Sequence, residues 1–261
     1  MAGVGLLAAL LEPWGLALAF VATCLQAALK RRFARGGPFQ RQPGFAAQKL
    51  VCMPLMMLVL LVGARGWMRA PRWSDLEPAA RLYEPDHGGR LTAQLSIAVG
   101  LWDLPIYLSD KDLRTPVMLA HHSITLGLQL LVVASQLLQY YGSFFFGVTE
   151  LSTLPLLIVD LFHPDHFVAL GDSYPTLNLA ARGCFAISFL SVRVVYWPFV
   201  LSHLWADLSW AQQSASGPAS AMLLRCVFAG SVFLTGLQFY WGLRIVRQIQ
   251  KMLCPKPRAD E

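Results

Sequence analysis

Two histidines, His121 and His122, are adjacent at the start of an apolar stretch, and the next apolar stretch carries Glu150 in its interior. Imidazole can act as a nucleophile or a general base near neutral pH, and a carboxylate such as Asp103 or Glu150 could orient it. Adjacent residues on a helix point about 100° apart. We therefore expect one imidazole to face a cavity and the other to face a neighbouring helix.

Other polar side chains interrupt the apolar segments around this histidine pair. In chain order they are Asp103, then His122, Thr125, Gln129 and Gln136, then Glu150 and Ser152, then Arg182, Arg193 and Tyr196. The spacings of three, four and seven residues within the second group predict one shared helix face. Arg182 and Arg193 are eleven residues apart, which predicts that they are nearly aligned on their helix.

The elements that carry these residues are predicted by composition. The chain has 261 residues, of which 56% are hydrophobic and 14% are charged, whereas about 25% are charged in soluble domains. Seven runs of about 20 mostly apolar residues predict membrane spans. The runs are Trp14–Leu29, Phe45–Gly63, Leu91–Leu108, Val117–Leu138, Ser143–Phe162, Leu179–Leu201 and Ala219–Val246. Since lipid-exposed backbone must satisfy its own hydrogen bonds, the fold predicted is an all-α polytopic membrane bundle with about seven transmembrane helices.

Charged groups inside such spans are energetically costly. Each one near mid-bilayer costs about 2.5–3.5 kcal/mol, so three without partners would approach the whole stability of a typical domain, about 5–15 kcal/mol. We therefore expect these groups to be paired, neutral or hydrated around a hollow that lipid can reach. The alternative is a polar network, for instance Arg193 with Asp103 or Glu150, that fixes helix register without doing chemistry.

Basic residues predict the orientation and the division of the chain. With the N-terminus outside the cytoplasm, thirteen Lys and Arg residues fall on the cytoplasmic side and five on the other, which predicts a cytoplasmic C-terminus. We assign residues 1–44 to a signal-anchor span and a basic cytoplasmic loop, residues 45–252 to one transmembrane domain and residues 253–261 to a short cytoplasmic tail. Cleavage of the first segment stays an alternative.

The net charge of +6 does not require nucleic acid, because basic clusters beside spans act as topology signals and contacts to anionic lipids. We expect membrane lipids as partners, no nucleic acid, and a homo- or hetero-oligomer as a further option. Metal catalysis is a competing interpretation, since His163 and His166 form an HxxH beside Asp165. Ligands would have to converge from separate loops, so we expect no metal site and no tightly bound cofactor.

Five sequence pieces, taken in order, resemble a known family. They are Gly100–Asp103, Leu119–Thr125, Thr149–Thr153, Phe189–Arg193 with Trp197–Phe199, and Leu237–Trp241. Over about residues 47–252 the chain resembles the TLC-domain family, which includes the ceramide synthases, the translocation-associated membrane proteins and the smaller TLC-domain-containing proteins. The resemblance implies a multi-pass protein of the endoplasmic reticulum or another cellular membrane.

The resemblance also implies two functions. Ceramide synthases carry the histidine pair, followed in the next span by a His-Asp and a further Asp, and join a fatty acyl group from acyl-CoA to a sphingoid base. This chain keeps His121 and His122 but has Glu150–Thr153 at the acidic set. It therefore looks like the smaller proteins, for which roles in ceramide synthesis and in adjusting phospholipid acyl composition have been proposed.

Our leading hypothesis is an intramembrane cavity that binds an acyl lipid, in a protein that regulates sphingolipid or phospholipid acyl composition. Its expected lipid contacts are Thr125, Gln129, Ser152, Arg193 and Tyr196. The alternative is an N-acyltransferase with acyl-CoA as co-substrate, catalytic residues His121, His122, Asp103 and Glu150, and CoA contacts at Lys111 and Arg114. A seven-helix receptor would share only the span count and the orientation.

Overall fold

The computed structural model describes residues 12–214 and 218–254, and every regular element in these two ranges is a helix. Seven helices or helix stacks are long and apolar enough to cross a membrane. They are Pro13–Ala34, Pro43–Arg69, Pro78–Ser109, Pro116–Ser135, Gln139–Leu161, Pro175–Ser214 and Ala221–Met252. The predicted all-α membrane bundle with seven spans is thus confirmed. Of the predicted terminal segments, residues 1–11 and 255–261 lie outside the described residues.

Proline and short polar side chains determine where the helices begin. Proline is the first residue of α2 (Pro13–Ala34), α3 (Pro43–Arg69) and α6 (Pro116–Ser135), where its missing N–H costs no hydrogen bond. The Thr115 hydroxyl accepts a hydrogen bond from the Met118 amide at the start of α6. The Asp86 carboxylate likewise accepts hydrogen bonds from two glycine amides at the start of α5 (His87–Ser109). Both helices therefore have capped N-termini.

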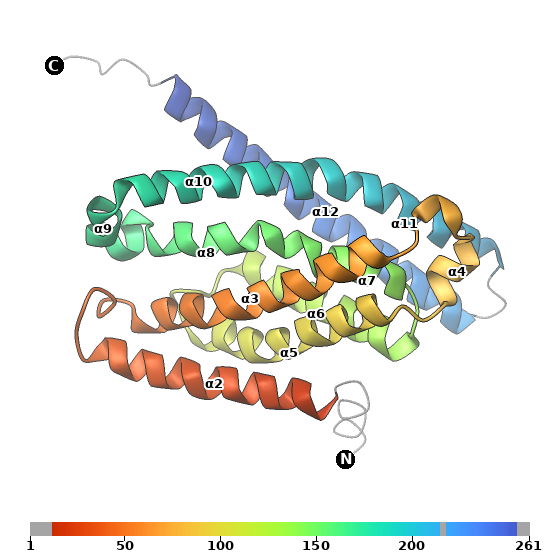
Figure 1. Ribbon diagram of the computed structural model, residues 1–261, viewed down its shortest axis with the longest axis horizontal. Coiled ribbons are helices and arrows are strands. Elements are labelled where there is room, and N and C mark those ends of the chain that lie inside the picture. Colours follow the sequence, from red (N-terminus) through yellow and green to blue (C-terminus); the bar gives the residue numbers. More distant parts are fainter. Residues whose placement is uncertain (1–11, 215–217, 255–261) are drawn as a thin grey trace.

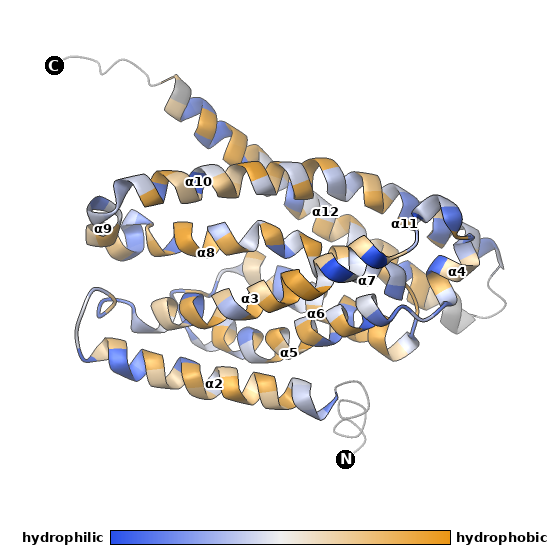
Figure 2. Ribbon diagram, in the orientation of Figure 1, coloured by the Kyte–Doolittle hydropathy of each residue, from blue (hydrophilic) through white to orange (hydrophobic). Residues whose placement is uncertain are grey.

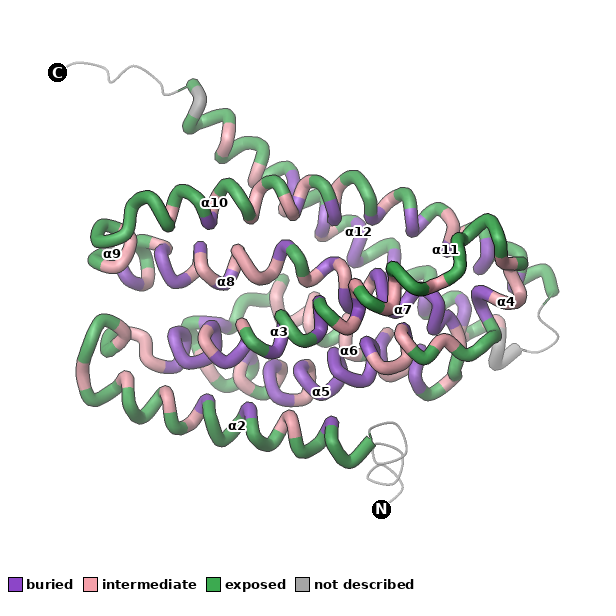
Figure 3. The backbone as a smooth tube through the Cα atoms, in the orientation of Figure 1, coloured by how far each residue is buried: buried purple, intermediate pink, exposed green. Residues whose placement is uncertain are grey.

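The spans run back and forth between two ends of the bundle (Figure 1). One end carries α9 (Pro164–Ser173) and the other carries α4 (Pro78–Tyr83) together with the short helix η1 (Trp73–Asp75); we call them the α9 end and the α4 end. Figure 2 shows apolar residues along the middle of the helices and hydrophilic residues gathered towards the ends. Helices α3 and α5 contact each other and are largely buried, whereas α2 contacts both from the outside and is mostly exposed (Figure 3).

The fifth span is broken into three pieces, where a single uninterrupted run was predicted. They are α7 (Gln139–Phe145), the 3₁₀ helix η2 (Val148–Leu151) and α8 (Thr153–Leu161). The break lies at Gly147, which packs against α3 so closely that a Cβ on Gly147 would be 2.5 Å from the Gly63 Cα. Glycine allows this approach, and the chain leaves the helical path at the same point. The consequence is that Glu150 sits on an irregular segment.

The sixth span is longer than predicted and changes its winding in the middle. Helix α10 (Pro175–Phe189) continues through a π-helical segment, η3 (Leu190–Tyr196), into α11 (Trp197–Ser214). Pro198 has no N–H to donate to the preceding turn, and a widened turn directly before it accommodates that loss. The last helix, α12 (Pro218–Leu253), has 36 residues, and its C-terminal turns project past α10, away from the other helices (Figure 1).

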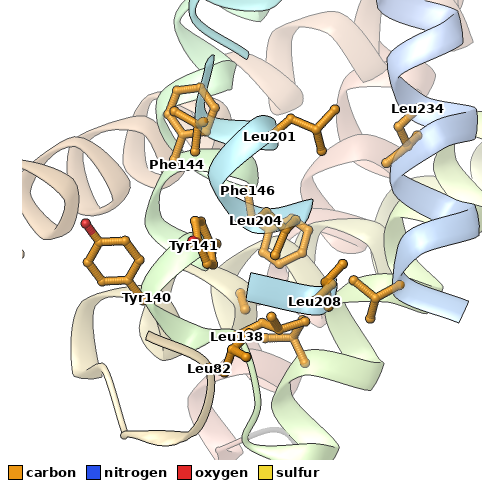
Figure 4. Close-up of a cluster of buried hydrophobic side chains, with 14 of the residues drawn as sticks. Leu82, Leu138, Tyr140, Tyr141, Phe144, Phe146, Leu201, Leu204, Leu208 and Leu234 are labelled. Atoms are coloured by element: carbon orange, nitrogen blue, oxygen red, sulfur yellow. The ribbon is translucent and has the colours of Figure 1, made fainter. Parts of the chain in front are cut away.

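The largest hydrophobic core lies towards the α4 end, where α7 and α11 meet (Figure 4). Tyr141, Phe144 and Leu208 are nearly or fully buried in it. Beside this core, Arg81 forms a bidentate pair with Asp207, with N···O distances of 2.5 and 2.7 Å, and the Tyr141 hydroxyl donates to the same carboxylate. The guanidinium also donates to the carbonyls of Trp73 and Leu76. This network fastens the connection between α3 and α5 to α11.

Candidate functional site

A cavity of about 490 Å³ lies between α3, α5, α6, α8, α10 and α12. Its volume falls in the range of ordinary small-molecule sites. Eight of the polar residues singled out in the sequence line it: Asp103, His121, His122, Thr125, Gln129, Glu150, Ser152 and Arg193. The exposed Asp112 and Arg244 are also in its wall, so this wide cavity reaches the protein surface at the α9 end.

His122 is held between a carboxylate and an aromatic ring. Its Nδ1 lies 3.5 Å from Oδ2 of Asp103, and the Gln48 amide donates a 2.9 Å hydrogen bond to the other carboxylate oxygen. The ring centroid of Tyr107 is 4.3 Å from that of His122. The Nε2 atom of His122 is buried and has no hydrogen-bond partner among the described residues. The carboxylate can therefore set the orientation of an imidazole whose other nitrogen is available to a ligand.

His121 approaches a different helix. Its ring meets the Trp241 ring of α12 edge to face, with centroids 5.3 Å apart, and it meets the His122 ring at the same centroid distance. Both imidazoles nevertheless line the wide cavity. The expected contact of one imidazole with a neighbouring helix is present at His121, but His121 lines the cavity as well, because the hollow spans the angle between the two side chains.

Arg193 projects from the π-helical segment into the cavity and is 8% exposed. Its Nε donates to the Ser152 hydroxyl at 2.8 Å, and its Nη2 lies 3.3 Å from the Thr153 hydroxyl and 3.6 Å from a Glu150 carboxylate oxygen. Of the two carboxylates considered from the sequence, Glu150 is the one that pairs with Arg193, while Asp103 faces His122. The guanidinium is thus compensated, as a buried cation requires.

Several buried polar atoms around the cavity lack hydrogen-bond partners within the described part of the chain. They are Nδ1 of His121, Nε2 of His122, Oγ1 of Thr125 and Oε1 of Gln48. An unsatisfied buried donor or acceptor costs about 1–3 kcal/mol. One of the four atoms belongs to α3 and three belong to α6, and all four residues line the wide cavity, so they offer hydrogen-bonding groups to a polar ligand.

A second, narrower hollow of about 80 Å³ continues from the polar side chains described above towards the α4 end. It shares four residues with the wide cavity: His121, Thr125, Glu150 and Arg193. Beyond them most of its wall is apolar, and the lining includes Val132, Leu138, Phe146, Leu204, Val227 and Leu234, while Thr149, Ser231 and Gln238 add polar side chains. Several of these side chains belong to the core drawn in Figure 4. We call this hollow the inner slot. The polar cluster of His121, His122, Glu150 and Arg193 lies where the slot joins the wide cavity.

Residues 46–247 match the family model of the TLC domain. The chain belongs to the TLC-domain family. No curated protein and no solved structure matches it significantly. The match covers all the residues of the wide cavity except Phe45, and all those of the inner slot. Both hollows therefore lie within the TLC domain of this chain. The protein is a TLC-domain membrane protein, which is consistent with a role related to membrane lipid.

Three of the polar residues singled out in the sequence lie elsewhere in the TLC domain, and one of them, Tyr196, was an expected lipid contact. The Tyr196 hydroxyl accepts a hydrogen bond from the Trp67 indole at 3.2 Å, and Tyr196 lines neither hollow. Arg182 donates to Asn178 and is likewise outside both, since the π-helical segment ends the regular spacing on which its alignment with Arg193 depended. Gln136 is not on the polar face of α6, because the helix ends at Ser135 and Gln136 adopts a left-handed conformation with φ of 59°.

The TLC domain also contains an ion pair with a buried lysine that sequence reasoning missed. Lys49 Nζ lies 2.8 Å from Asp160 Oδ2, and both residues line the wide cavity. In the sequence Lys49 was treated only as an orientation signal. Both residues lie inside predicted apolar runs, Lys49 in the run that begins at Phe45 and Asp160 in the fifth run. A charged residue inside an apolar run was the signal that could have indicated the pair. Gln48 and Cys52, one helical turn apart on α3, are further lining residues that were not anticipated.

The HxxH motif has a different environment. The His166 ring stacks on Phe45 with centroids 3.9 Å apart, and its Nδ1 lies 2.5 Å from the Gln42 side-chain oxygen. Burial is the main cause that lowers the pKa of His166 below its usual value, and the nearby His163 lowers this pKa further. Among the described residues, no group of three or more His, Cys, Asp or Glu side chains is arranged to hold a metal ion.

Proposed function

We propose that this TLC-domain protein binds an acyl lipid between its spans and thereby regulates the acyl composition of sphingolipids or phospholipids in the endoplasmic reticulum or a related membrane. The observation that carries the proposal is the position of the polar cluster between a wide cavity and a largely apolar slot. A lipid has the same division, because a polar head is joined to an apolar chain.

The residues that line the two hollows favour one orientation of the bound lipid. The polar head or carbonyl group would lie beside His121, His122 and Thr125, where unpartnered polar atoms gather. The chain would extend into the inner slot past Val132 and Val227. The slot is too narrow for a complete chain at rest, so binding requires its side chains to move apart. Each methylene buried there contributes about 0.8 kcal/mol.

Retention of lipid by slot variants tests the proposal. Val227→Phe places a larger ring in the inner slot, and Val195→Phe is the matched control because Val195 is 70% exposed on the outer face of η3. The variants are purified in parallel and co-purifying lipids are quantified by mass spectrometry. We expect the slot variant to lose most of the bound acyl lipid and the control to keep it. Equal lipid content in both, with the same fold by circular dichroism, would refute the proposal.

A second candidate, N-acyl transfer from acyl-CoA, is favoured by the contact between His122 and Asp103. In this reaction His122 Nε2 would attack the thioester carbonyl, the CoA thiolate would leave, and an amine would then take the acyl group from the imidazole. CoA would approach from the α9 end, where the wide cavity reaches the surface and where Lys111 and Arg114 are exposed.

The transferase candidate is tested with purified protein, acyl-CoA and a long-chain base. We expect an N-acylated product that falls by about 10²-fold or more in His122→Ala, while His87→Ala, which alters an exposed histidine at the α4 end, has little effect. If no product exceeds the His122→Ala background, the protein binds lipid without transferring the acyl group.

A further inference from the structure

A separate groove of about 600 Å³ lies at the α4 end, between the last turns of α3, the connection that follows it, α4 and the start of α5. It shares no lining residue with the wide cavity or the inner slot. Its floor includes Gly66 and Gly88, where two helices come so close that a Cβ on Gly88 would be 2.9 Å from the Gly66 Cα. The groove is therefore part of the rigid packing of α3 against α5.

Two arginines line this groove without any partner. Arg65 and Arg69 are one turn apart on α3 and both are exposed. Neither takes part in an ion pair or a side-chain hydrogen bond within the described residues, whereas the neighbouring Arg81 is fully engaged by Asp207 and backbone carbonyls. Like charges at this spacing on a helix repel each other. A shared anion would remove that repulsion.

A free carboxylate lines the same groove. Glu84 is exposed and is not within 4 Å of either arginine, so no ion pair closes the site. The other acidic residue of the lining, Asp86, is different, because its carboxylate accepts the amides of Gly88 and Gly89. The groove thus presents two arginines and two carboxylates without an ion-pair partner among the described residues, and of the carboxylates Glu84 is the one without hydrogen bonds.

The level of the groove in the membrane follows from helix length. Helix α3 has 27 residues, and about 20 suffice to cross the hydrocarbon core. Its last turns, which carry Arg65 and Arg69, therefore reach the layer of lipid head groups at the α4 end. On the side towards the hydrocarbon core the lining becomes apolar, with Val62 and Leu91.

We propose that this groove binds the head of a phospholipid that carries both a phosphate and an ammonium group. Arg65 and Arg69 bind the phosphate, for which the planar guanidinium offers paired donors. Glu84 binds the ammonium, and Val62 and Leu91 contact the glycerol and the first methylenes of the chains. An anionic head without an amine would leave Glu84 unpaired and repelled, so the groove favours a zwitterionic lipid.

The full-length protein in detergent is titrated with dioleoyl phosphatidylethanolamine, dioleoyl phosphatidylglycerol and dioleoylglycerol, and adducts are counted by native mass spectrometry. The double variant Arg65→Gln, Arg69→Gln should weaken binding of both phospholipids by at least about tenfold and leave the diacylglycerol unchanged. Arg72→Gln, Arg90→Gln is the matched control, because these arginines lie at the same end but outside the groove lining. Equal loss in both double variants would overturn the site.

Glu84→Gln tests the ammonium half of the proposal. We expect it to abolish the preference for phosphatidylethanolamine over phosphatidylglycerol while both lipids still bind. If the wild-type protein shows no such preference, the zwitterionic assignment is wrong. Soluble glycerophosphoethanolamine distinguishes the source of the head group: it should bind far more weakly than the whole lipid, and equal affinity would show that the ligand is not a membrane lipid.

Discussion

Glu150 and Asp103 have different partners although both are carboxylates in the same cavity. Asp103 receives a hydrogen bond from Gln48 and faces His122, whereas Glu150 lies 3.6 Å from Arg193. Arg193 also donates to two hydroxyl groups. The cluster is thus a set of compensated charges with imidazole nitrogens left open, which is an arrangement suited to holding a polar ligand.

The substitution Glu150→Gln tests the compensation of Arg193. The amide keeps the shape of the side chain but removes the charge opposite a buried guanidinium, so we expect a loss of about 1–3 kcal/mol of stability. Thermal unfolding in detergent measures it, with the exposed Glu77→Gln as the control. Unchanged unfolding of the Glu150 variant would mean that the two hydroxyl groups suffice to hold Arg193.

At the scale of elements, the site depends on irregular segments. The break at Gly147 places Glu150 on η2, and the π-helical turns of η3 point Arg193 inward. The break is held by glycine packing, since a Cβ on Gly63 would lie 2.5 Å from the Gly147 Cα and 2.8 Å from the Ser143 carbonyl oxygen. Both neighbours are backbone atoms that cannot rotate away.

Gly63→Ala should therefore destabilise the protein by about 1–3 kcal/mol, because the methyl group forces α3 and the fifth span apart. Gly127→Ala is the matched control: a Cβ there meets nothing within 4 Å, and alanine is favoured over glycine in a helix by up to about 1 kcal/mol. Unfolding midpoints in detergent compare the two variants. A neutral Gly63 variant would contradict the close contact between these elements.

These elements also show how far the sequence could predict the site. Apolar runs predicted the spans, and spacing on α6 correctly grouped His122, Thr125 and Gln129 on the cavity side. The partner of Arg193 stayed open, because it depends on the relative height and rotation of three helices. Lys49 was counted only among the thirteen basic residues of the cytoplasmic side, since periodicity within one helix does not reveal the Asp160 that approaches it from α8.

On the scale of the whole molecule, the two ends of the bundle differ. The wide cavity reaches the surface at the α9 end, and the groove with Arg65 and Arg69 lies at the α4 end. The thirteen to five distribution of Lys and Arg predicts that the α9 end faces the cytoplasm. In this orientation a water-soluble acyl donor would approach the cavity from the cytoplasm.

Epitope tags at the two termini test this orientation. We expect a C-terminal tag to become accessible to antibody when only the plasma membrane is permeabilised, and an N-terminal tag to need permeabilisation of internal membranes too. A cytosolic protein and a luminal protein serve as controls in the same cells. The reverse pattern would place the opening of the wide cavity on the other side of the membrane.

In the proposed function, an acyl chain occupies the inner slot while its polar end lies at the cluster of His121, His122, Glu150 and Arg193. The most direct measurement is photo-crosslinking with an acyl lipid that carries a diazirine at the chain end, followed by peptide mass spectrometry. We expect crosslinks at slot residues such as Val132, Leu204 and Val227, and we expect Val227→Phe to suppress them. Crosslinks confined to outward-facing residues such as Ile187 and Val195 would contradict it.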